Sequence, residues 1–244
     1  MKEKKGSKME EFTSKGTGDS EVSNEELENQ AQNLIQKNSV VIIIVAVVVI
    51  AIAGYMYYSN MQTAEEINEA NQLLAKVIPV YEQANFEAAL QGNPGMAGEA
   101  GDVTGLIDIA EKYDGVPTGA VAALLAGNTL ILQDDYEKAQ KYFEIGMDTD
   151  SKAVLAGSNA GIGACYENKG NYSDAANYYV NAATFAETPA IKARYNLFAA
   201  LAFEKDGNTN KAAEFYTKVA KDENQSEYTG DAKTGLTRLG MIIE

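Results

Sequence analysis

An uninterrupted apolar run near the N-terminus constrains this chain more than any other feature. It extends from Val40 to Ala53 and continues through Gly54-Tyr55-Met56-Tyr57-Tyr58, and none of these 19 residues is charged. A helix of that length covers roughly 28 Å, close to the thickness of the hydrocarbon layer of a bilayer. The many Val and Ile residues would favour a strand in water, but in lipid only a helix satisfies its own backbone groups. We therefore predict a transmembrane helix over residues 39–59, which contacts the bilayer through residues 40–58.

The run separates a short polar tail from a long acidic segment. Residues 1–38 contain six lysines and eight acidic residues, whereas the chain after the run contains 14 basic and 27 acidic residues. The tail has too few large apolar residues to bury a core, so residues 1–38 are predicted to be a disordered polar tail. All of its lysines precede the run, and Glu65, Glu66 and Glu69 follow it. This favours an anchor in the inner (cell) membrane with a cytoplasmic N-terminus and a periplasmic or extracytoplasmic C-terminal domain.

A cleaved signal peptide is the alternative to an anchor. Ala51-Ile52-Ala53 has the small-x-small pattern of a cleavage site. The polar tail is long for the positively charged region of a signal peptide, which favours the uncleaved anchor. Cleavage after Ala53 nevertheless stays open.

The composition argues against several classes of function. An acidic domain repels phosphate backbones, so we expect no nucleic-acid partner. The chain has no histidine, which removes the commonest general base and metal ligand, and we expect neither an enzyme nor a metal or cofactor site. The only cysteine, Cys165, has no partner for an internal disulfide, and we interpret it as a buried thiol.

Three stretches of the acidic segment are similar to one another. They begin at Asp134, Gly170 and Gly207, and each has a turn signal, a helical start, an alanine and an aromatic residue four positions later. The alanines are 36 and 37 residues apart, and a small residue stands 12 positions before each of them. Self-similarity at such a period is typical of stacked helical hairpins. The residues predicted to pack the hairpins are Gly127, Ala139 and Phe143, then Gly163, Ala175 and Tyr179, then Ala200, Ala212 and Tyr216.

These residues resemble the tetratricopeptide repeat family, and the resemblance extends from Gly119 to Glu223. It implies that the small residues let two antiparallel helices approach closely and that the aromatic residue fills the gap between hairpins. The large aromatic residue that the family has early in each first helix is replaced here by Ala123, Asn159 and Asn196. The predicted fold is all-α, with one N-terminal transmembrane helix followed by an α-solenoid of tetratricopeptide-type hairpins.

The domain boundaries follow from this pattern. Residues 60–115 are predicted to form juxtamembrane helices and a divergent first repeat, residues 116–225 three repeats, and residues 226–244 a C-terminal capping helix. Within the first of these segments, Pro79 is expected to bend or end the helix that continues from the anchor, and Val80–Leu90 to form a second helix. Gln91–Gly105 contains five glycines and is predicted to be a loop.

A stack of such repeats binds peptides in the groove formed by the first helix of each hairpin. Spacing predicts five groove positions per hairpin, and we expect a partner protein to contact them. The alternative is that several of these residues are buried against neighbouring helices or a partner subunit. The positions are Val121, Leu124, Asn128, Ile131 and Leu132, then Gly157, Ala160, Ala164, Glu167 and Asn168, then Arg194, Leu197, Leu201, Glu204 and Lys205.

A short tail, one anchor and a repeat domain form a layout similar to the ancillary-subunit family of the bacterial Sec translocon. That resemblance implies periplasmic repeats near emerging chains, with envelope or translocon components or periplasmic chaperones as partners. The leading hypothesis is a membrane-anchored scaffold or co-chaperone-like module at the outer face of the inner membrane. The alternative is a structural subunit of a larger membrane complex, held by its anchor and repeats.

Overall fold

A computed structural model describes residues 39–93, 102–221 and 227–241, and within them the side chains of residues 39–47 and 55–63 are not described. The described part is all-α except for one pair of two-residue strands. The chain divides into two units, Met1–Ser59 and Asn60–Glu244. The tail over residues 1–38, predicted to be disordered, lies outside the described residues.

Helix α2 (Ser39–Glu82) begins in the first unit. Of the predicted transmembrane segment 39–59, only residues 48–54 have described side chains. Among the side chains that the structure describes, no helix is both long enough and apolar enough to cross a membrane. The large apolar side chains in this part of α2 are 50% to 71% exposed; they are Val48, Val49, Ile50 and Ile52.

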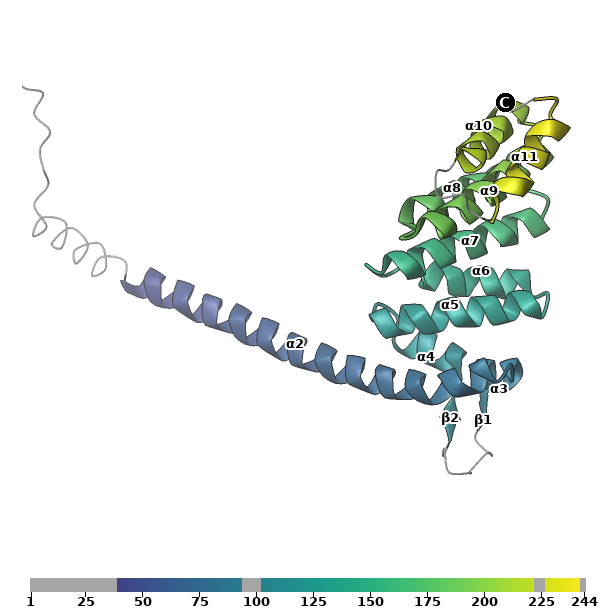
Figure 1. The fold of residues 1–244 in the computed structure, drawn as a ribbon. Coiled ribbons are helices and arrows are strands. Elements are labelled where there is room, and N and C mark those ends of the chain that lie inside the picture. Colours follow the sequence, from purple (N-terminus) through teal and green to yellow (C-terminus); the bar gives the residue numbers. More distant parts are fainter. Residues whose placement is uncertain (1–38, 94–101, 222–226, 242–244) are drawn as a thin grey trace, which may run out of the picture. The chain divides into compact units, whose positions relative to one another are not determined.

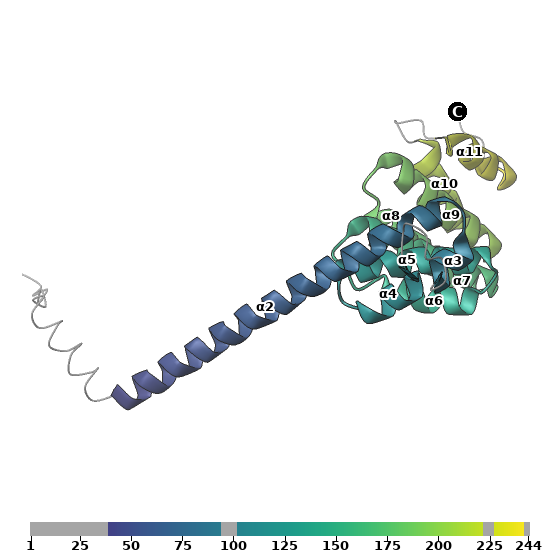
Figure 2. The same cartoon turned by 90° about the horizontal axis from the view of Figure 1, so that it is seen from below.

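The second unit is a stack of short helices that follow one another in chain order (Figure 1). Helices α5 and α6, α7 and α8, and α9 and α10 pack as hairpins, and α11 packs against α10 and α9. Both views place α11 at the end of the stack, next to α10 (Figures 1 and 2). The bounds are α3 Phe86–Gln91, α4 Leu106–Lys112, α5 Pro117–Leu132, α6 Tyr136–Ile145, α7 Lys152–Asn168, α8 Tyr172–Phe185, α9 Pro189–Lys205, α10 Thr209–Ala220 and α11 Thr229–Arg238.

Pro79 does not end α2, and the prediction of a second helix over Val80–Leu90 is wrong. The helix continues to Glu82, because a proline close to the end of a helix removes only one backbone bond and its fixed φ fits the last turn. The chain then reverses at Ala84, which has a positive φ of 58°. The short helix α3 follows this turn.

The predicted loop Gln91–Gly105 is partly paired. Strand β1 (Gly92–Asn93) pairs antiparallel with β2 (Val103–Thr104). Gly92 has a φ of +78°, and a Cβ there would lie 2.6 Å from the carbonyl oxygen of Val103. Only glycine permits this close approach of the two strands.

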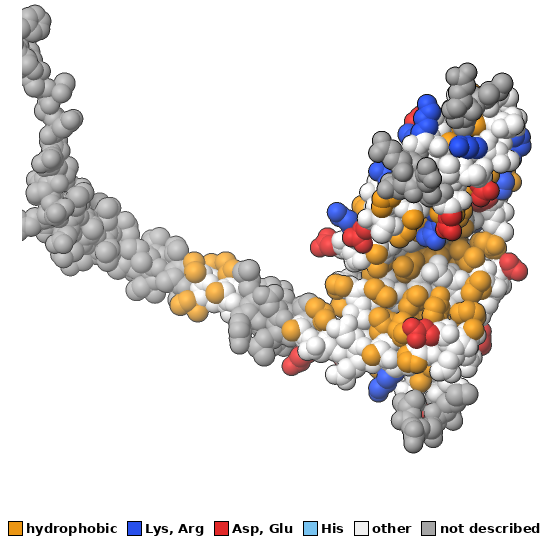
Figure 3. Space-filling model, viewed as in Figure 1, with side chains coloured by type: hydrophobic (Ala, Val, Ile, Leu, Met, Phe, Trp, Pro, Cys, Tyr) orange, Lys and Arg blue, Asp and Glu red, His pale blue; other side chains and the backbone are white. Residues whose placement is uncertain are grey.

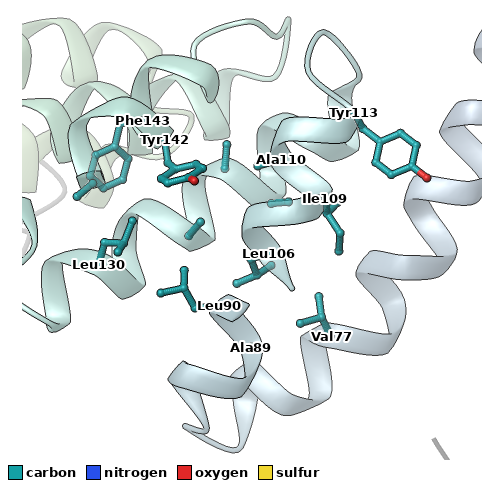
Figure 4. Close-up of a cluster of buried hydrophobic side chains, with 14 of the residues drawn as sticks. Val77, Ala89, Leu90, Leu106, Ile109, Ala110, Tyr113, Leu130, Tyr142 and Phe143 are labelled. Atoms are coloured by element: carbon teal, nitrogen blue, oxygen red, sulfur yellow. The ribbon is translucent and has the colours of Figure 1, made fainter. Parts of the chain in front are cut away.

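The first part of the second unit has a core that several elements share. Val77 of α2, Leu90 of α3, and Leu106 and Ile109 of α4 are fully buried. Figure 4 shows these side chains directed toward one another between the helices. The end of α2 is therefore part of the repeat domain's core.

Neighbouring helices, both within a hairpin and between hairpins, approach one another where aromatic rings lie against glycines. The ring of Phe143 in α6 is fully buried between Gly127 of α5 and Gly161 of α7. A Cβ would lie 2.6 Å from the Phe143 ring at Gly127 and 2.3 Å from it at Gly161. In the same way, a Cβ on Gly163 would lie 2.9 Å from the ring of Tyr179. All nine residues predicted to pack the repeats are buried: Gly127, Ala139, Phe143, Gly163, Ala175, Tyr179, Ala200, Ala212 and Tyr216.

The last helix covers the third hairpin. Ala232 and Leu236 of α11 are buried, and a Cβ on Gly235 would lie 2.5 Å from the ring of Tyr216. Helix α11 occupies part of the segment 226–244 that was predicted to form the capping helix.

Candidate protein-binding surface

The first helix of each hairpin has one stripe of side chains that the core does not cover. On α5 this stripe contains the predicted positions Val121, Leu124, Asn128 and Ile131, which are half-buried, and Leu132, which is 63% exposed. It is apolar at every position except Asn128. We call these five residues the α5 stripe.

Small residues continue the stripe on α7. Gly157, Ala160 and Ala164 are half-buried. The methyl groups of Leu124 lie 3.0 Å from the place where a Cβ on Gly157 would stand. The two helices therefore approach closely here, and the surface has no side chain that projects far from α7.

On α9 the stripe differs from the prediction. Leu197 does not face solvent but is 4% exposed and lies in the core of the third hairpin. Phe198, which was not among the predicted positions, lies on the surface instead and is 36% exposed. The predicted Leu201 is also 36% exposed. Leu197 stands 37 residues after Ala160, which is half-buried on α7, so α9 buries the position that α7 leaves partly open. The signal was available, because Phe198 is four residues after the predicted Arg194 and three before Leu201.

Phe198 also connects two hairpins. Its ring lies edge-on to the ring of Tyr179 in α8, with 5.5 Å between the centroids, and edge-on to Tyr195 at 6.3 Å. It stands 37 residues after Gly161, at a position where α7 and α11 have glycine. A large side chain at this position extends the apolar surface of α9 outward.

Two predicted groove acids hold the stack together and are not free ligand groups. Glu167 of α7 accepts a hydrogen bond from the Tyr179 hydroxyl at 2.9 Å and pairs with Lys205 of α9 at 2.6 Å. Burial raises the pKa of Tyr179 well above its usual range, so its hydroxyl stays a donor. Each of these contacts crosses from one helix to the next.

Glu204 of α9 repeats this arrangement one hairpin later. It accepts a hydrogen bond from the Tyr216 hydroxyl at 2.5 Å, and Arg238 of α11 donates to both of its oxygens at 2.5 and 2.7 Å. The hydrogen bonds from Arg238 are the main reason that the pKa of Glu204 lies below its ordinary value. At neutral pH this carboxylate is ionised, and both of its oxygens already accept hydrogen bonds from Tyr216 and Arg238.

An acid that was not predicted has the same role before the first hairpin. Glu111 of α4 accepts from the Tyr142 hydroxyl at 2.9 Å and pairs with Lys141 at 2.7 Å. Burial, reinforced by this carboxylate, raises the pKa of Tyr142 to about 12. Three acids thus tie successive layers to one another along the stack.

The groups with nucleophilic or metal-binding chemistry are not arranged as a reaction centre in the described part of the chain. Cys165 is fully buried, and burial raises the pKa of its thiol to about 11. A thiol in that state is a poor nucleophile at neutral pH. Among the described residues no group of three or more Cys, Asp and Glu could hold a metal ion.

Charge and hydrophobicity divide the surface along the stack. Figure 3 shows hydrophobic side chains gathered over α5 and α7, and most of the Lys and Arg atoms of that view lie toward α10 and α11. Residues 60–188 contain six basic and 19 acidic residues, whereas residues 189–221, which form the third hairpin, contain six basic and three acidic residues. The apolar surface and the basic hairpin are therefore separate features.

Comparisons with protein-family models and with curated proteins find no match for this chain. Its function is therefore inferred from its own residues.

Proposed function

We propose that this chain is a membrane-tethered scaffold whose tetratricopeptide-type domain binds proteins at the outer face of the inner membrane. The single observation that carries the proposal is the α5 stripe. It puts an exposed Leu132 and four half-buried residues in one row along a helix. Such rows on a soluble surface are typical of sites that a partner covers.

The energetics favour a protein partner for this stripe. Complete burial of an exposed leucine is worth about 1.5–3 kcal/mol. Leu132 and Leu201 are 63% and 36% exposed, so together they would contribute about this amount, and the rest of the stripe would have to supply the remainder of the binding free energy. The surface between them is formed by the small residues of α7, so a partner helix or strand meets no obstacle there. This matches the way in which an amphipathic segment docks in a groove.

The tether is supported by the apolar run and by its described part. In the described part of the run, Val48, Val49, Ile50 and Ile52 are each 50% to 71% exposed on α2. A bilayer would cover them. The resemblance in layout to the ancillary subunits of the Sec translocon leads us to propose envelope or translocon components, or periplasmic chaperones, as partners.

Site-specific photocrosslinking tests the proposed surface. A photoreactive amino acid would replace Leu132 on α5 or Leu201 on α9, with Glu137 on the second helix of the first hairpin as the control, because Glu137 is also exposed. Protein adducts from Leu132 and Leu201 but not from Glu137 are expected. Equal adducts from all three positions, or lipid adducts alone in a chain with unchanged circular dichroism, would contradict the proposal.

The size of the native assembly separates a scaffold from a fixed subunit. Membranes dissolved in a mild detergent would be fractionated by size, and the crosslinked partners identified in each fraction. A scaffold is expected in a heterogeneous set of assemblies. A single stoichiometric complex would favour the structural-subunit alternative.

A further inference from the structure

A cleft lies away from the α5 stripe, where three helices meet. It has a volume of about 890 Å³ and is formed by the end of α8, the beginning of α9 and the end of α10. Lys192, Lys218 and Glu187 are its charged lining residues. Its apolar lining includes Val180, Ala183, Ala193, Phe215 and Val219.

This cleft faces the side of α9 opposite to the candidate protein-binding surface. Consecutive residues of a helix are rotated by about 100°. Lys192 and Asn196 on the cleft side are therefore roughly half a turn away from Phe198 and Leu201 on the surface stripe. A ligand in the cleft would leave that surface accessible.

The cleft is open because its side chains are small. In the first hairpin, Met147 fills the corresponding position, and its sulfur lies 3.3 Å from the side-chain nitrogen of the fully buried Asn159. The residue 36 positions after Met147 is Ala183, and Asn196 stands 37 positions after Asn159. Replacement of a thioether by a methyl group leaves space beside α9 that the chain itself does not fill.

The lining of the cleft contains two lysines and one glutamate, whereas the domain as a whole is acidic. Lys218 pairs with Glu214 at 2.7 Å and lies 4.0 Å from the centre of the Phe215 ring, so its stem forms part of the cleft wall. Lys192 is exposed and makes no ion pair with any residue that the structure describes. Both lysines belong to the third hairpin, the segment with an excess of basic residues.

We propose, building on the protein-binding role above, that this cleft binds an acidic peptide segment of a partner protein that carries one large apolar anchor residue. The apolar side chain would occupy the space beside Ala183 and Phe215. A carboxylate of the segment would pair with Lys192, and a second carboxylate would compete with Glu214 for Lys218. The preference for an acidic segment rests on Lys192, which makes no ion pair among the described residues, whereas Lys218 is paired with Glu214. A segment without a large apolar residue would leave the apolar lining of the cleft uncovered and should bind more weakly.

Peptide selection on the full chain in phosphatidylcholine nanodiscs tests this inference. The probe is a displayed library of random 12-residue peptides, and the affinity of the selected peptides is then measured by fluorescence anisotropy. Peptides rich in Asp and Glu around a large apolar residue are expected. Their affinity should fall at least about tenfold with Ala183→Met, which fills the cleft as Met147 fills its counterpart.

Charge variants give the matched control. Lys192→Glu should lower the affinity for these peptides about three- to tenfold. Lys233→Glu, the same change on an exposed lysine of α11, should leave that affinity unchanged. Unchanged circular dichroism would show that each variant is folded. Affinity that is insensitive to both Ala183→Met and Lys192→Glu would overturn the inference.

Two further outcomes separate this site from the other surface and from lipid. If binding of the selected peptides is abolished by Leu132→Asp and Leu201→Asp but is unchanged by Ala183→Met, the proposed function survives and the cleft site is refuted. If phosphatidylglycerol vesicles compete for the cleft as strongly as the peptides do, the ligand is a lipid surface and the peptide proposal is wrong.

Discussion

At the scale of single residues, this domain depends on glycines that lie against aromatic rings. Phe143 has no exposed surface, and neither of the two glycines on its faces leaves space for a Cβ. A buried ring has little freedom to move, because protein interiors are packed as densely as organic crystals. Addition of one methyl group at either glycine therefore forces α6 away from the neighbouring helix.

Gly161→Ala should destabilise the domain although alanine is the better helix former. The added Cβ would lie 2.3 to 2.5 Å from ring atoms of Phe143. Overpacking of this kind costs about 1–3 kcal/mol, which exceeds the gain of roughly 1 kcal/mol in helix propensity. Thermal unfolding followed by circular dichroism would measure the difference.

Gly230→Ala is the matched control for this substitution. Gly230 lies in α11, is exposed, and has nothing within 4 Å of an added Cβ. It should keep or slightly increase the melting temperature. Equal effects of Gly161→Ala and Gly230→Ala would refute the role of the Phe143 contact.

Glu204→Gln should destabilise the third hairpin in a pH-dependent way. Arg238 holds the pKa of Glu204 below its ordinary value, so the carboxylate stabilises the fold above its unfolded pKa, and this stability is lost as the pH falls through the folded pKa. At pH 7 the variant should lose about 1 kcal/mol. The difference from the natural chain should begin to shrink as the pH falls below about 4.3, the value of an unperturbed glutamate, and should disappear below the folded pKa of Glu204.

Urea unfolding at several pH values would test this, with Glu214→Gln as the control. Glu214 is 59% exposed and pairs with Lys218 in the same helix, so its loss should change stability by only a few tenths of a kcal/mol. A pH-independent effect of Glu204→Gln would contradict the assigned role.

At the scale of elements, each helix contacts mainly its neighbours along the stack. Helix α11 covers the third hairpin, and its Gly235 lies against Tyr216. In such arrays stability is approximately a sum of repeat terms and nearest-neighbour terms. Loss of contacts at one end of the stack should therefore destabilise the adjacent hairpin and leave distant hairpins unchanged.

A chain that ends at Lys221 should lose protection in α9 and α10 but not in α5 and α6. Removal of α11 exposes Tyr216 and takes away the fully buried Leu236. Hydrogen exchange measured by mass spectrometry would detect faster exchange in the third hairpin. Uniformly faster exchange in all hairpins would show that the stack unfolds as one unit instead.

The sequence predicts the packing of this domain better than its surface. Spacing identifies Gly127 and Phe143 because only certain sizes fit between two helices, and this constraint recurs with a fixed period. Surface positions have no such constraint, so spacing alone did not separate the buried Leu197 from the exposed Phe198. The strand pair β1–β2 was missed because two-residue strands depend on backbone bonds and leave no alternating pattern.

At the scale of the whole molecule, the two units carry different kinds of apolar surface. In the first unit, the described side chains from Val48 to Ile52 are exposed on α2. In the second unit, Leu132, Phe198 and Leu201 expose large apolar side chains on the first helices of two hairpins. We interpret the former as the lipid contact and the latter as the protein contact.

Alkaline carbonate extraction followed by flotation tests the tether most directly. The full chain would be reconstituted with phosphatidylcholine vesicles and compared with the double variant Val48→Asp/Ile52→Asp. Each aspartate at the centre of a membrane helix costs roughly 2.5–3.5 kcal/mol, so the variant should be released. We expect the natural chain to float with the vesicles after carbonate treatment, and a natural chain that stays in the aqueous fraction without detergent would contradict a membrane-tethered scaffold.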